Sequence, residues 1–267
     1  MTFTLGPALL FCPADRPDRF AKALDRADAV ILDLEDAVAP ENRAAARAAI
    51  ANADLDPARV IVRVNEVGSP DWDADLAAAS GYRTIMVPKS DRRLLDDLPA
   101  GFDVIALCES AAGVIDAPAL AKQVSALMWG AEDLVASLGG SSSRFADGTY
   151  RDVARTARAN VLLAAGAAGI PAIDTVHLDI DDLDGLRAEA EDAAASGFAA
   201  TACIHPSHAA VIREAYAPTD EQVAWATRVL DAAAGEAGVF RLDGGMVDGP
   251  VLRHAESVLR RAASPRA

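Results

Sequence analysis

Short apolar runs rich in Val, Ile and Leu alternate along the chain with longer Ala-rich stretches whose apolar positions recur at helical spacing. The short runs predict eight strands, at residues 8–12, 29–34, 60–64, 84–87, 103–108, 126–129, 170–173 and 201–204. The longer stretches predict helices at residues 16–26, 41–51, 71–79, 91–98, 114–123, 152–168 and 186–195. Strands that alternate with helices in this way are typical of a parallel sheet in an α/β protein, and eight of them favour a (β/α)8 TIM barrel.

The pattern changes after the eighth strand. A predicted helix at residues 220–234 is followed by a Gly-rich stretch at 238–250 and a last helix at 251–262. We therefore interpret residues 1–216 as a catalytic barrel domain. Residues 217–267 form a C-terminal extension of helices and loops, which we expect to cap the barrel or, more specifically, a neighbouring subunit.

Composition narrows the class of protein. Hydrophobic residues make up 52% of the 267 residues, and 25 Lys and Arg against 40 Asp and Glu leave a net charge of −15. Because such an acidic surface repels phosphate groups, we expect no nucleic-acid partner and no anionic membrane partner. No apolar run reaches the roughly 18–20 residues of a membrane span. Three widely spaced cysteines and an N-terminus unlike a signal peptide indicate a cytoplasmic protein with reduced thiols.

Polar residues follow nearly every predicted strand, at the barrel end where such enzymes carry their reacting groups. Glu109 and Asp133 end consecutive strands, so we expect them to be neighbours at the barrel mouth. Two facing carboxylates repel unless a proton or cation lies between them, and oxygen ligands without nearby His or Cys favour magnesium. The alternative is a solvated acidic rim, or a pair neutralised by arginine.

A single cation, Arg63, interrupts the apolar third strand. A guanidinium beside the metal could stabilise a developing enolate or carboxylate oxygen. Its alternative role is an internal ion pair with Glu35 or Asp36, and the two roles can coexist. Glu35 and Asp36 could orient metal-bound water molecules, whereas we interpret Asp33 as structural because it lies earlier in its strand.

Further basic residues lie at two other strand ends. Lys89 could form a Schiff base with a ketone substrate, although neutralisation of the acidic ring is the simpler role. Arg16, Arg19 and Lys22 open the first predicted helix, where they could hold a polyphosphate or form ordinary surface ion pairs.

Two other segments could contribute to a substrate site. The stretch Gly139–Arg144 could act as a flexible loop that closes over the substrate, although it is not a P-loop. His205, directly after the eighth strand, could line a substrate channel, whereas His177, His208 and His254 have no metal-ligand spacing.

Seven motifs in chain order resemble the citrate lyase beta-subunit (CitE-like) family of the HpcH/HpaI aldolase/citrate lyase superfamily, especially its stand-alone actinobacterial members. They are Leu10–Pro17, Ile31–Val38, Arg63–Asn65, Val87–Lys89, Trp129–Leu134, Gly197–Phe198 with Ile204–Pro206, and Gly245–Asp248. The resemblance covers nearly the whole chain.

This resemblance implies a (β/α)8 barrel, often a homotrimer, that acts on 3-hydroxyacyl-CoA thioesters with magnesium. Glu109 and Asp133 would be the metal ligands, and Arg63 would bind the reacting oxygen. Asp248 would match a C-terminal catalytic Asp that can enter a neighbour's active site. Contacts to the substrate and its CoA portion would come from Phe11, Arg16, Lys22, Gly130, Ala131, Glu132, Ile204 and His205.

The predicted reaction is a retro-Claisen-type cleavage of citramalyl-CoA, malyl-CoA or 3-hydroxy-3-methylglutaryl-CoA to acetyl-CoA and a keto acid. Loss of the hydroxyl proton would collapse the substrate, Arg63 would stabilise the resulting enolate, and Asp248 would deliver the proton that quenches it. The alternatives are a citryl-CoA lyase subunit that acts inside a citrate lyase complex and a Schiff-base aldolase that uses Lys89.

Overall fold

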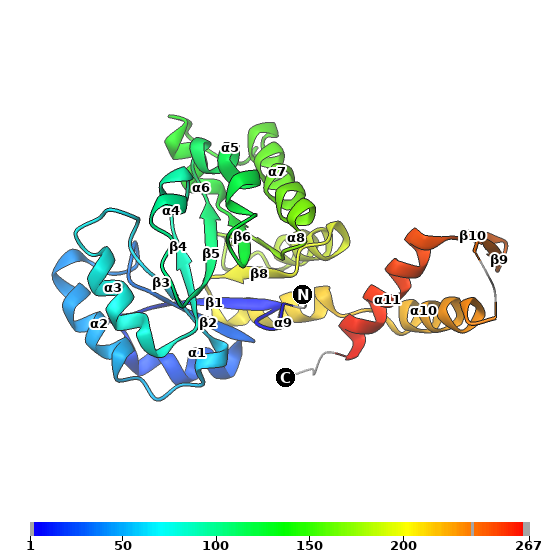
Figure 1. Cartoon of the computed structure of the whole chain (residues 1–267), viewed down its shortest axis with the longest axis horizontal. Coiled ribbons are helices and arrows are strands. Elements are labelled where there is room, and N and C mark those ends of the chain that lie inside the picture. The colour runs from blue at the N-terminus through cyan, green and yellow to red at the C-terminus, as the bar shows by residue number, and fades with distance from the viewer. Residues whose placement is uncertain (1–2, 236–237, 264–267) are drawn as a thin grey trace. The chain divides into compact units, whose positions relative to one another are not determined.

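Eight parallel strands close into a barrel in strict chain order in the computed structural model, which describes residues 3–235 and 238–263 (Figure 1). The strands are β1 (Ala8–Pro13), β2 (Ala29–Asp33), β3 (Val60–Arg63), β4 (Thr84–Val87), β5 (Asp103–Cys108), β6 (Ala126–Trp129), β7 (Ala172–Asp174) and β8 (Ala200–Cys203). The predicted (β/α)8 barrel is therefore confirmed, and every predicted strand is present to within two residues at each end.

Helices follow the strands and surround the barrel (Figure 1). The α-helices are α1 (Phe20–Arg26), α2 (Arg43–Ala51), α3 (Trp72–Ala78), α4 (Arg92–Asp96), α5 (Ala111–Leu120), α6 (Ala131–Ser137), α7 (Asp152–Ala168), α8 (Leu183–Ser196) and α9 (Pro206–Tyr216). Short 3-10 helices are η1 (Pro17–Arg19), η2 (Pro40–Asn42), η3 (Pro57–Arg59) and η4 (Ala79–Gly81).

The barrel interior is filled by apolar side chains from successive strands. Leu9, Ile31, Ile61, Met86 and Ile105 pack in one cluster and are almost completely inaccessible to water. Burying a large apolar side chain contributes about 1.5–3 kcal/mol, so this cluster is a major source of stability. A filled interior leaves the strand ends, rather than a central pore, to form a site.

The register of the strands decides which of their ends meet. Pro13 pairs with Asp33, and Asp33 pairs with Arg63, so the ends of β1, β2 and β3 lie side by side. Cys108 pairs with Trp129, which brings the residues that follow β5 and β6 together. Parallel strands in this register therefore bring Glu109 close to Gly130.

The sequence analysis missed two helices and shifted one strand. Helix α6 begins at Ala131, after the single residue Gly130 that follows β6, and α9 begins at Pro206, after the two residues that follow β8, so neither is separated from its strand by a distinct turn segment. Strand β7 begins at Ala172 rather than at the predicted residue 170. Gly169 ends α7 in the left-handed region (φ 71°), and Pro171 has no N–H to donate to a neighbouring strand.

The chain divides into two compact units, Met1–Ile212 and Arg213–Ala267. The second unit contains α10 (Asp220–Ala233), the antiparallel strands β9 (Phe240–Leu242) and β10 (Gly245–Val247), and α11 (Gly249–Ala263). Helices α10 and α11 pack through Ala226, Val229, Ala255 and Val258. Much of the Gly-rich stretch 238–250 thus forms a hairpin.

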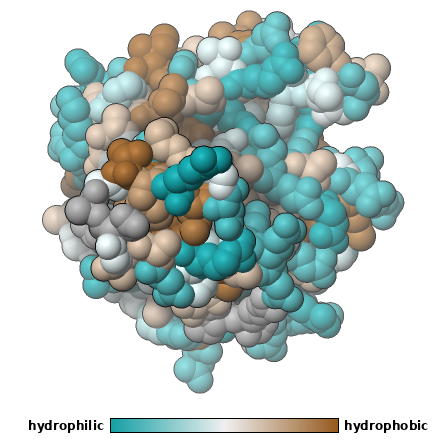
Figure 2. Space-filling view, turned by 90° about the vertical axis from the view of Figure 1, so that its right-hand side faces the viewer, coloured by the Kyte–Doolittle hydropathy of each residue, from teal (hydrophilic) through white to brown (hydrophobic). Residues whose placement is uncertain are grey.

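The protein surface is mostly polar in the view of Figure 2, where hydrophilic residues (teal) predominate and hydrophobic ones (brown) form small groups. Among the described residues, no helix combines the length and the apolar character that crossing a membrane would require. All three cysteines, Cys12, Cys108 and Cys203, are buried and form no disulfide.

Candidate active site

A cavity of about 420 Å³ opens at the carboxyl ends of the barrel strands. Nine of the predicted site residues line it: Phe11, Asp36, Arg63, Glu109, Gly130, Ala131, Glu132, Asp133 and Ile204. The sequence analysis did not assign eight other lining residues to the site: Pro13, Asp33, Ala37, Leu107, Met128, Thr175, Val176 and Leu178. Most of these eight are apolar, so no chemical signal distinguishes them from core residues in the sequence.

Arg63, at the end of β3, is buried and held by two carboxylates. Its Nε and Nη2 atoms donate to Oδ1 and Oδ2 of Asp33, each at 2.6 Å, and Nη1 lies 3.0 Å from Oε2 of Glu35. Burial alone would lower the pKa of Arg63, but these hydrogen bonds and charges raise it well above its usual value. The guanidinium also lies over the Phe11 ring, 5.0 Å from its centre. Arg63 is therefore a permanently charged and rigidly held cation in the cavity.

The sequence predicted that Arg63 forms an ion pair with Glu35 or with Asp36. The pair with Glu35 is present, whereas Asp36 is exposed and contacts Lys89 at 3.9 Å instead. The strongest contact comes from Asp33, which confirms its structural role. Asp33 also accepts backbone N–H groups of Glu35 and Ala37, so one carboxylate orders both the turn after β2 and the arginine.

Lys89, after β4, is paired rather than free. Its Nζ donates to Oε1 of Glu35, and its backbone N–H donates to Oε1 of Glu109 at 2.9 Å. The backbone lies in the left-handed region (φ 49°), which is strained for a residue with a side chain. Burial would lower the pKa of Lys89, but Glu35 raises it. A Schiff-base lysine needs the opposite shift, so these contacts favour the neutralising role.

Glu109, directly after β5, and Asp133, in the first turn of α6, line the same cavity, as expected for side chains that follow consecutive strands. Glu109 is 4% exposed, and burial together with the Asp133 charge raises its pKa to about 8. Among the described residues, no group of three or more His, Cys, Asp or Glu side chains could hold a metal ion. Two carboxylates alone suit magnesium, which keeps several water ligands and also takes substrate oxygens.

Close packing explains why residue 130 is glycine, and a hydrogen bond gives Glu132 a structural role. A Cβ atom at Gly130 would lie 2.8 Å from the Cβ of Glu109, so only glycine allows β6 to approach that carboxylate. Glu132 accepts a hydrogen bond from Oγ of Ser143 at 2.5 Å. The segment 139–144, expected to be a flexible loop, is thus attached to the cavity wall.

The predicted CoA contacts fall into two groups. Phe11 and Ile204 line the cavity, whereas Arg16, Lys22 and His205 lie outside its lining. Arg16, which precedes η1, and Lys22, on α1, are both exposed, and Arg16 pairs with Asp18 at 3.3 Å. This confirms one of the predicted surface ion pairs and leaves Lys22 accessible to a ligand at this end of the barrel.

Two further predicted residues lie elsewhere. His205 is half-buried, and its Nδ1 lies 2.6 Å from Oγ of Ser207. Asp248 belongs to the second compact unit, where its Oδ1 accepts the backbone N–H of Val251 at 3.2 Å and caps the start of α11. Asp248 thus caps this helix, a role in which aspartate is favoured.

Comparison with known proteins places this fold and site in a family. The model of the HpcH/HpaI aldolase/citrate lyase family matches residues 8–94 and 99–206. A citrate lyase subunit beta-like protein of Mycobacterium tuberculosis is 56% identical over 261 residues, 96% of each chain. Rat mitochondrial citramalyl-CoA lyase is 30% identical over 96% of this chain and 86% of its own length.

A solved structure agrees with this relationship. The crystal structure of CitE from Mycobacterium tuberculosis in complex with magnesium, acetoacetate and coenzyme A has a TM-score of 0.89 and 55% sequence identity. The match covers 97% of this chain and 98% of that chain. The family model spans more than half of the chain, and the relatives span nearly all of it. The chain belongs to the HpcH/HpaI aldolase/citrate lyase family.

Proposed function

We propose that this chain is a magnesium-dependent carbon–carbon lyase that cleaves or forms a 3-hydroxyacyl-CoA thioester, with acetyl-CoA and a keto acid as the other reaction partners. The observation that carries the proposal is the carboxylate pair of buried Glu109 and half-buried Asp133, which shares one cavity with the Arg63 guanidinium. The citramalyl-CoA lyase among its relatives and the CitE complex with magnesium, acetoacetate and coenzyme A support it.

The chemistry of the carboxylate pair fits a divalent cation. Among the described residues, no Lys or Arg forms an ion pair with Glu109, although it is buried beside Asp133. Its only hydrogen-bond donor among these residues is the backbone N–H of Lys89. Held by Glu109 and Asp133, magnesium would supply a Lewis acid for the carboxylate and hydroxyl oxygens of the substrate.

Arg63 has the donors that the reaction needs. A guanidinium has five N–H donors, and three of its nitrogens already contact Asp33 and Glu35. Two N–H groups remain for a substrate oxygen. Because Asp33 fixes the plane of the guanidinium, no reorganisation is needed when negative charge develops on an enolate oxygen. Arg63 therefore stabilises the enolate of acetyl-CoA in this proposal.

Binding of CoA and proton delivery involve residues outside the cavity lining. Arg16 and Lys22 would meet the phosphates of CoA, which the acidic chain otherwise repels, and Ile204 and His205 would contact the same portion. Asp248 would deliver the proton that quenches the enolate, from a neighbouring copy in a homotrimer. The three buried free cysteines support a cytoplasmic location.

A Schiff-base aldolase is the competing mechanism, and Lys89 tests it directly. Borohydride treatment in the presence of a keto acid would add the reduced keto acid to Lys89 only if an imine forms. We expect no such adduct, because Lys89 is protonated and paired with Glu35. An adduct on Lys89, located by peptide mass spectrometry, would replace the metal-dependent mechanism.

The substrate is best identified by product analysis. Citramalyl-CoA, malyl-CoA, 3-hydroxy-3-methylglutaryl-CoA and citryl-CoA are each incubated with the full chain, with magnesium or with EDTA. We expect one of these thioesters to be cleaved to acetyl-CoA and the corresponding keto acid, and only in the incubation with magnesium. Turnover of citryl-CoA alone, or activity only with copurified citrate lyase subunits, would favour the subunit role. Equal turnover in EDTA would contradict the proposal.

A further inference from the structure

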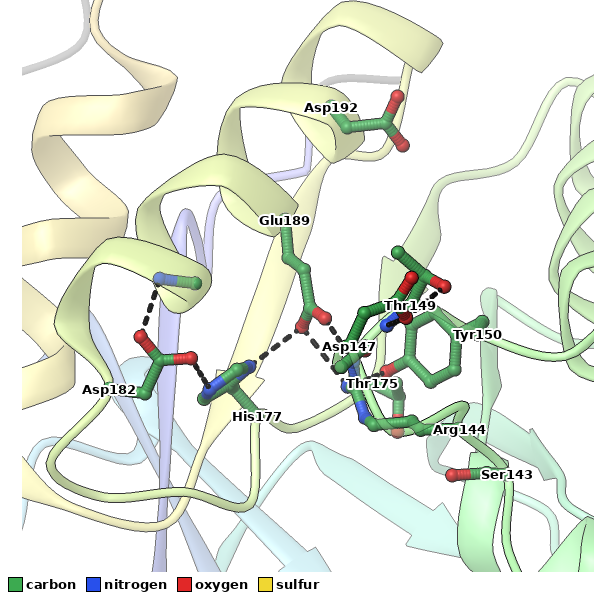
Figure 3. A network of polar contacts seen from close by, with 12 residues as sticks. Ser143, Arg144, Asp147, Thr149, Tyr150, Thr175, His177, Asp182, Glu189 and Asp192 are labelled. Carbon is green, nitrogen blue, oxygen red and sulfur yellow. Dashed lines mark hydrogen bonds and ion pairs between the residues drawn. The ribbon is translucent and has the colours of Figure 1, made fainter.

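Two loops beside the cavity meet at one carboxylate, Glu189 on α8, although each loop follows a different strand (Figure 3). Arg144, in the loop between α6 and α7, donates to Oε1 of Glu189 and, at 3.2 Å, to Oε2. His177, in the loop between β7 and α8, has its Nδ1 2.9 Å from Oε2. Glu189 therefore contacts two loops that come from different parts of the sequence.

Each of these contacts lies next to the cavity wall. Ser143, the neighbour of Arg144, donates to Glu132, which lines the cavity. The neighbours of His177, Val176 and Leu178, line the cavity themselves. The two loops are thus attached to the cavity on one side and to Glu189 on the other.

The charges of the network compensate one another. Burial would raise the pKa of Glu189, but His177 and Arg144 lower it below its usual value. The hydrogen bond with Glu189 raises the pKa of His177, and Asp182 lies 3.4 Å from its other nitrogen. The side chains of Arg144 and His177 are 17% and 8% exposed, so water replaces lost contacts poorly there.

Arg144 has a second attachment that fixes its direction. Its guanidinium lies over the Tyr150 ring, 3.8 Å from the centre, and Nη2 donates to the Tyr150 hydroxyl. Tyr150 in turn packs edge-on against Trp129, the last residue of β6. The loop between α6 and α7 is therefore joined to the barrel and to α8 at the same residue.

We propose that Glu189 is a positioning residue that joins the α6–α7 loop to the β7–α8 loop, so that the two cavity walls at Glu132 and at Val176–Leu178 become ordered together. With both walls in place, the cavity fits its thioester substrate. The role in substrate binding rests on the proposed lyase function, whereas the joining of the loops does not. Glu189 acts through other residues and touches no reacting atom.

The chain offers a matched control on the same helix. Asp192, one turn further along α8, pairs with Arg158 at 2.6 Å, and Figure 3 shows it apart from the Glu189 contacts. Arg158 also pairs with Asp174, so it keeps one partner when Asp192 is changed. Asp192→Asn therefore removes an ion pair from α8 without releasing either loop.

Hydrogen exchange of the magnesium-loaded full chain, without substrate, tests the joining of the loops. We expect Glu189→Gln to increase exchange in both segments, 139–151 and 175–182, while Asp192→Asn leaves both unchanged. Arg144→Lys, which keeps the charge but not the two-point contact, is expected to give the same pattern to a smaller extent. Increased exchange within α8 alone, or in neither loop, would show a merely structural role and overturn the proposal.

Kinetics then test the consequence for binding. We expect Glu189→Gln to raise KM for the thioester roughly tenfold with little change in kcat, because the walls position substrate and carry no reacting group. An unchanged KM with both loops loosened would overturn the binding role. If the wild-type chain turns over no thioester, the proposed function fails, while the exchange experiment still decides whether Glu189 joins the loops.

Discussion

At the barrel mouth, Asp33 accepts two hydrogen bonds from the Arg63 guanidinium, and the Nε–Oδ1 and Nη2–Oδ2 distances are both 2.6 Å. Such a two-point contact fixes the plane of the guanidinium as well as its position. In the proposed mechanism, catalysis and stability therefore depend on the same side chain, Arg63. Removing Arg63 altogether would leave two buried carboxylates without their shared partner, which typically costs about 3–5 kcal/mol.

The first prediction separates the two roles of Arg63. Arg63→Lys keeps the positive charge but not the two-point contact, and we expect kcat to fall about a hundredfold or more while the chain stays folded. Arg63→Ala should additionally lower the thermal midpoint. Steady-state kinetics measure kcat, and thermal melting measures the midpoint, of both variants. An Arg63→Lys variant with nearly wild-type kcat would restrict Arg63 to its structural role.

The second prediction concerns the carboxylates at Glu109 and Asp133. Magnesium should raise the Tm of the wild-type chain, because it binds the folded state and relieves the repulsion between them. Glu109→Gln and Asp133→Asn should lose both the Tm increase and the lyase activity while remaining folded. A control substitution, Asp116→Asn on α5, should keep both, because Asp116 is half-buried outside the cavity lining and asparagine can still accept the backbone N–H of Arg92. Full activity of either variant in EDTA would exclude this pair as the metal site.

Hydrophobic periodicity was sufficient to predict the barrel, because each strand is a short apolar run and each is needed to close the sheet. Strand ends then identified Arg63, Glu109 and Asp133, since parallel strands bring their carboxyl ends together. Helices α6 and α9, which begin within three residues of the ends of β6 and β8, were not found in this way.

The Glu189 network shows what a sequence cannot reveal. Arg144 and Glu189 are 45 residues apart, and nothing in their local surroundings indicates that they meet. His177 lacked metal-ligand spacing, yet its partner is a carboxylate 12 residues away on the next helix. Contacts of this kind depend on loop conformation, which the pattern of strands and helices does not determine.

The third prediction is a pH dependence that comes from His177. Its pKa in the folded chain is raised, so the stability it contributes is complete below about pH 6.5 and is lost as the pH rises through the folded value. Glu189 and Asp182 favour the charged imidazole, whereas Arg144 and burial oppose it. The nearby His208 has a lowered pKa, because burial disfavours its charged form, and gives the opposite trend.

Comparison with a variant isolates His177, because burial, the main cause of the His208 shift, is common to both proteins. The free energy of unfolding of the wild type should exceed that of His177→Gln most at acidic pH, and the difference should shrink as the pH rises above the ordinary histidine pKa of about 6.5. Urea denaturation at a series of pH values measures it. A difference that stays constant, or grows with pH, would show that His177 is not charged in the folded chain.

The last prediction separates capping from catalysis at Asp248. Its side chain accepts the N–H of Val251 at the start of α11. Asparagine caps a helix about as well as aspartate, whereas alanine costs about 1 kcal/mol. Asp248→Asn should therefore keep the wild-type Tm, and Asp248→Ala should lower it slightly. If the carboxylate delivers the proton, both variants should be nearly inactive, and the asparagine variant shows that loss of the cap is not the cause.

Mixed oligomers then show which copy supplies Asp248. Asp248→Asn and Arg63→Lys chains should each be nearly inactive alone, since each lacks one group of the site. Refolded together, they should regain part of the activity if the carboxylate comes from a neighbouring copy, because some interfaces then combine an intact Arg63 with an intact Asp248. Native mass spectrometry confirms that the chains have mixed. Mixed oligomers without activity would assign Asp248 to its own chain, whereas an active Asp248→Asn variant would leave it with the cap alone.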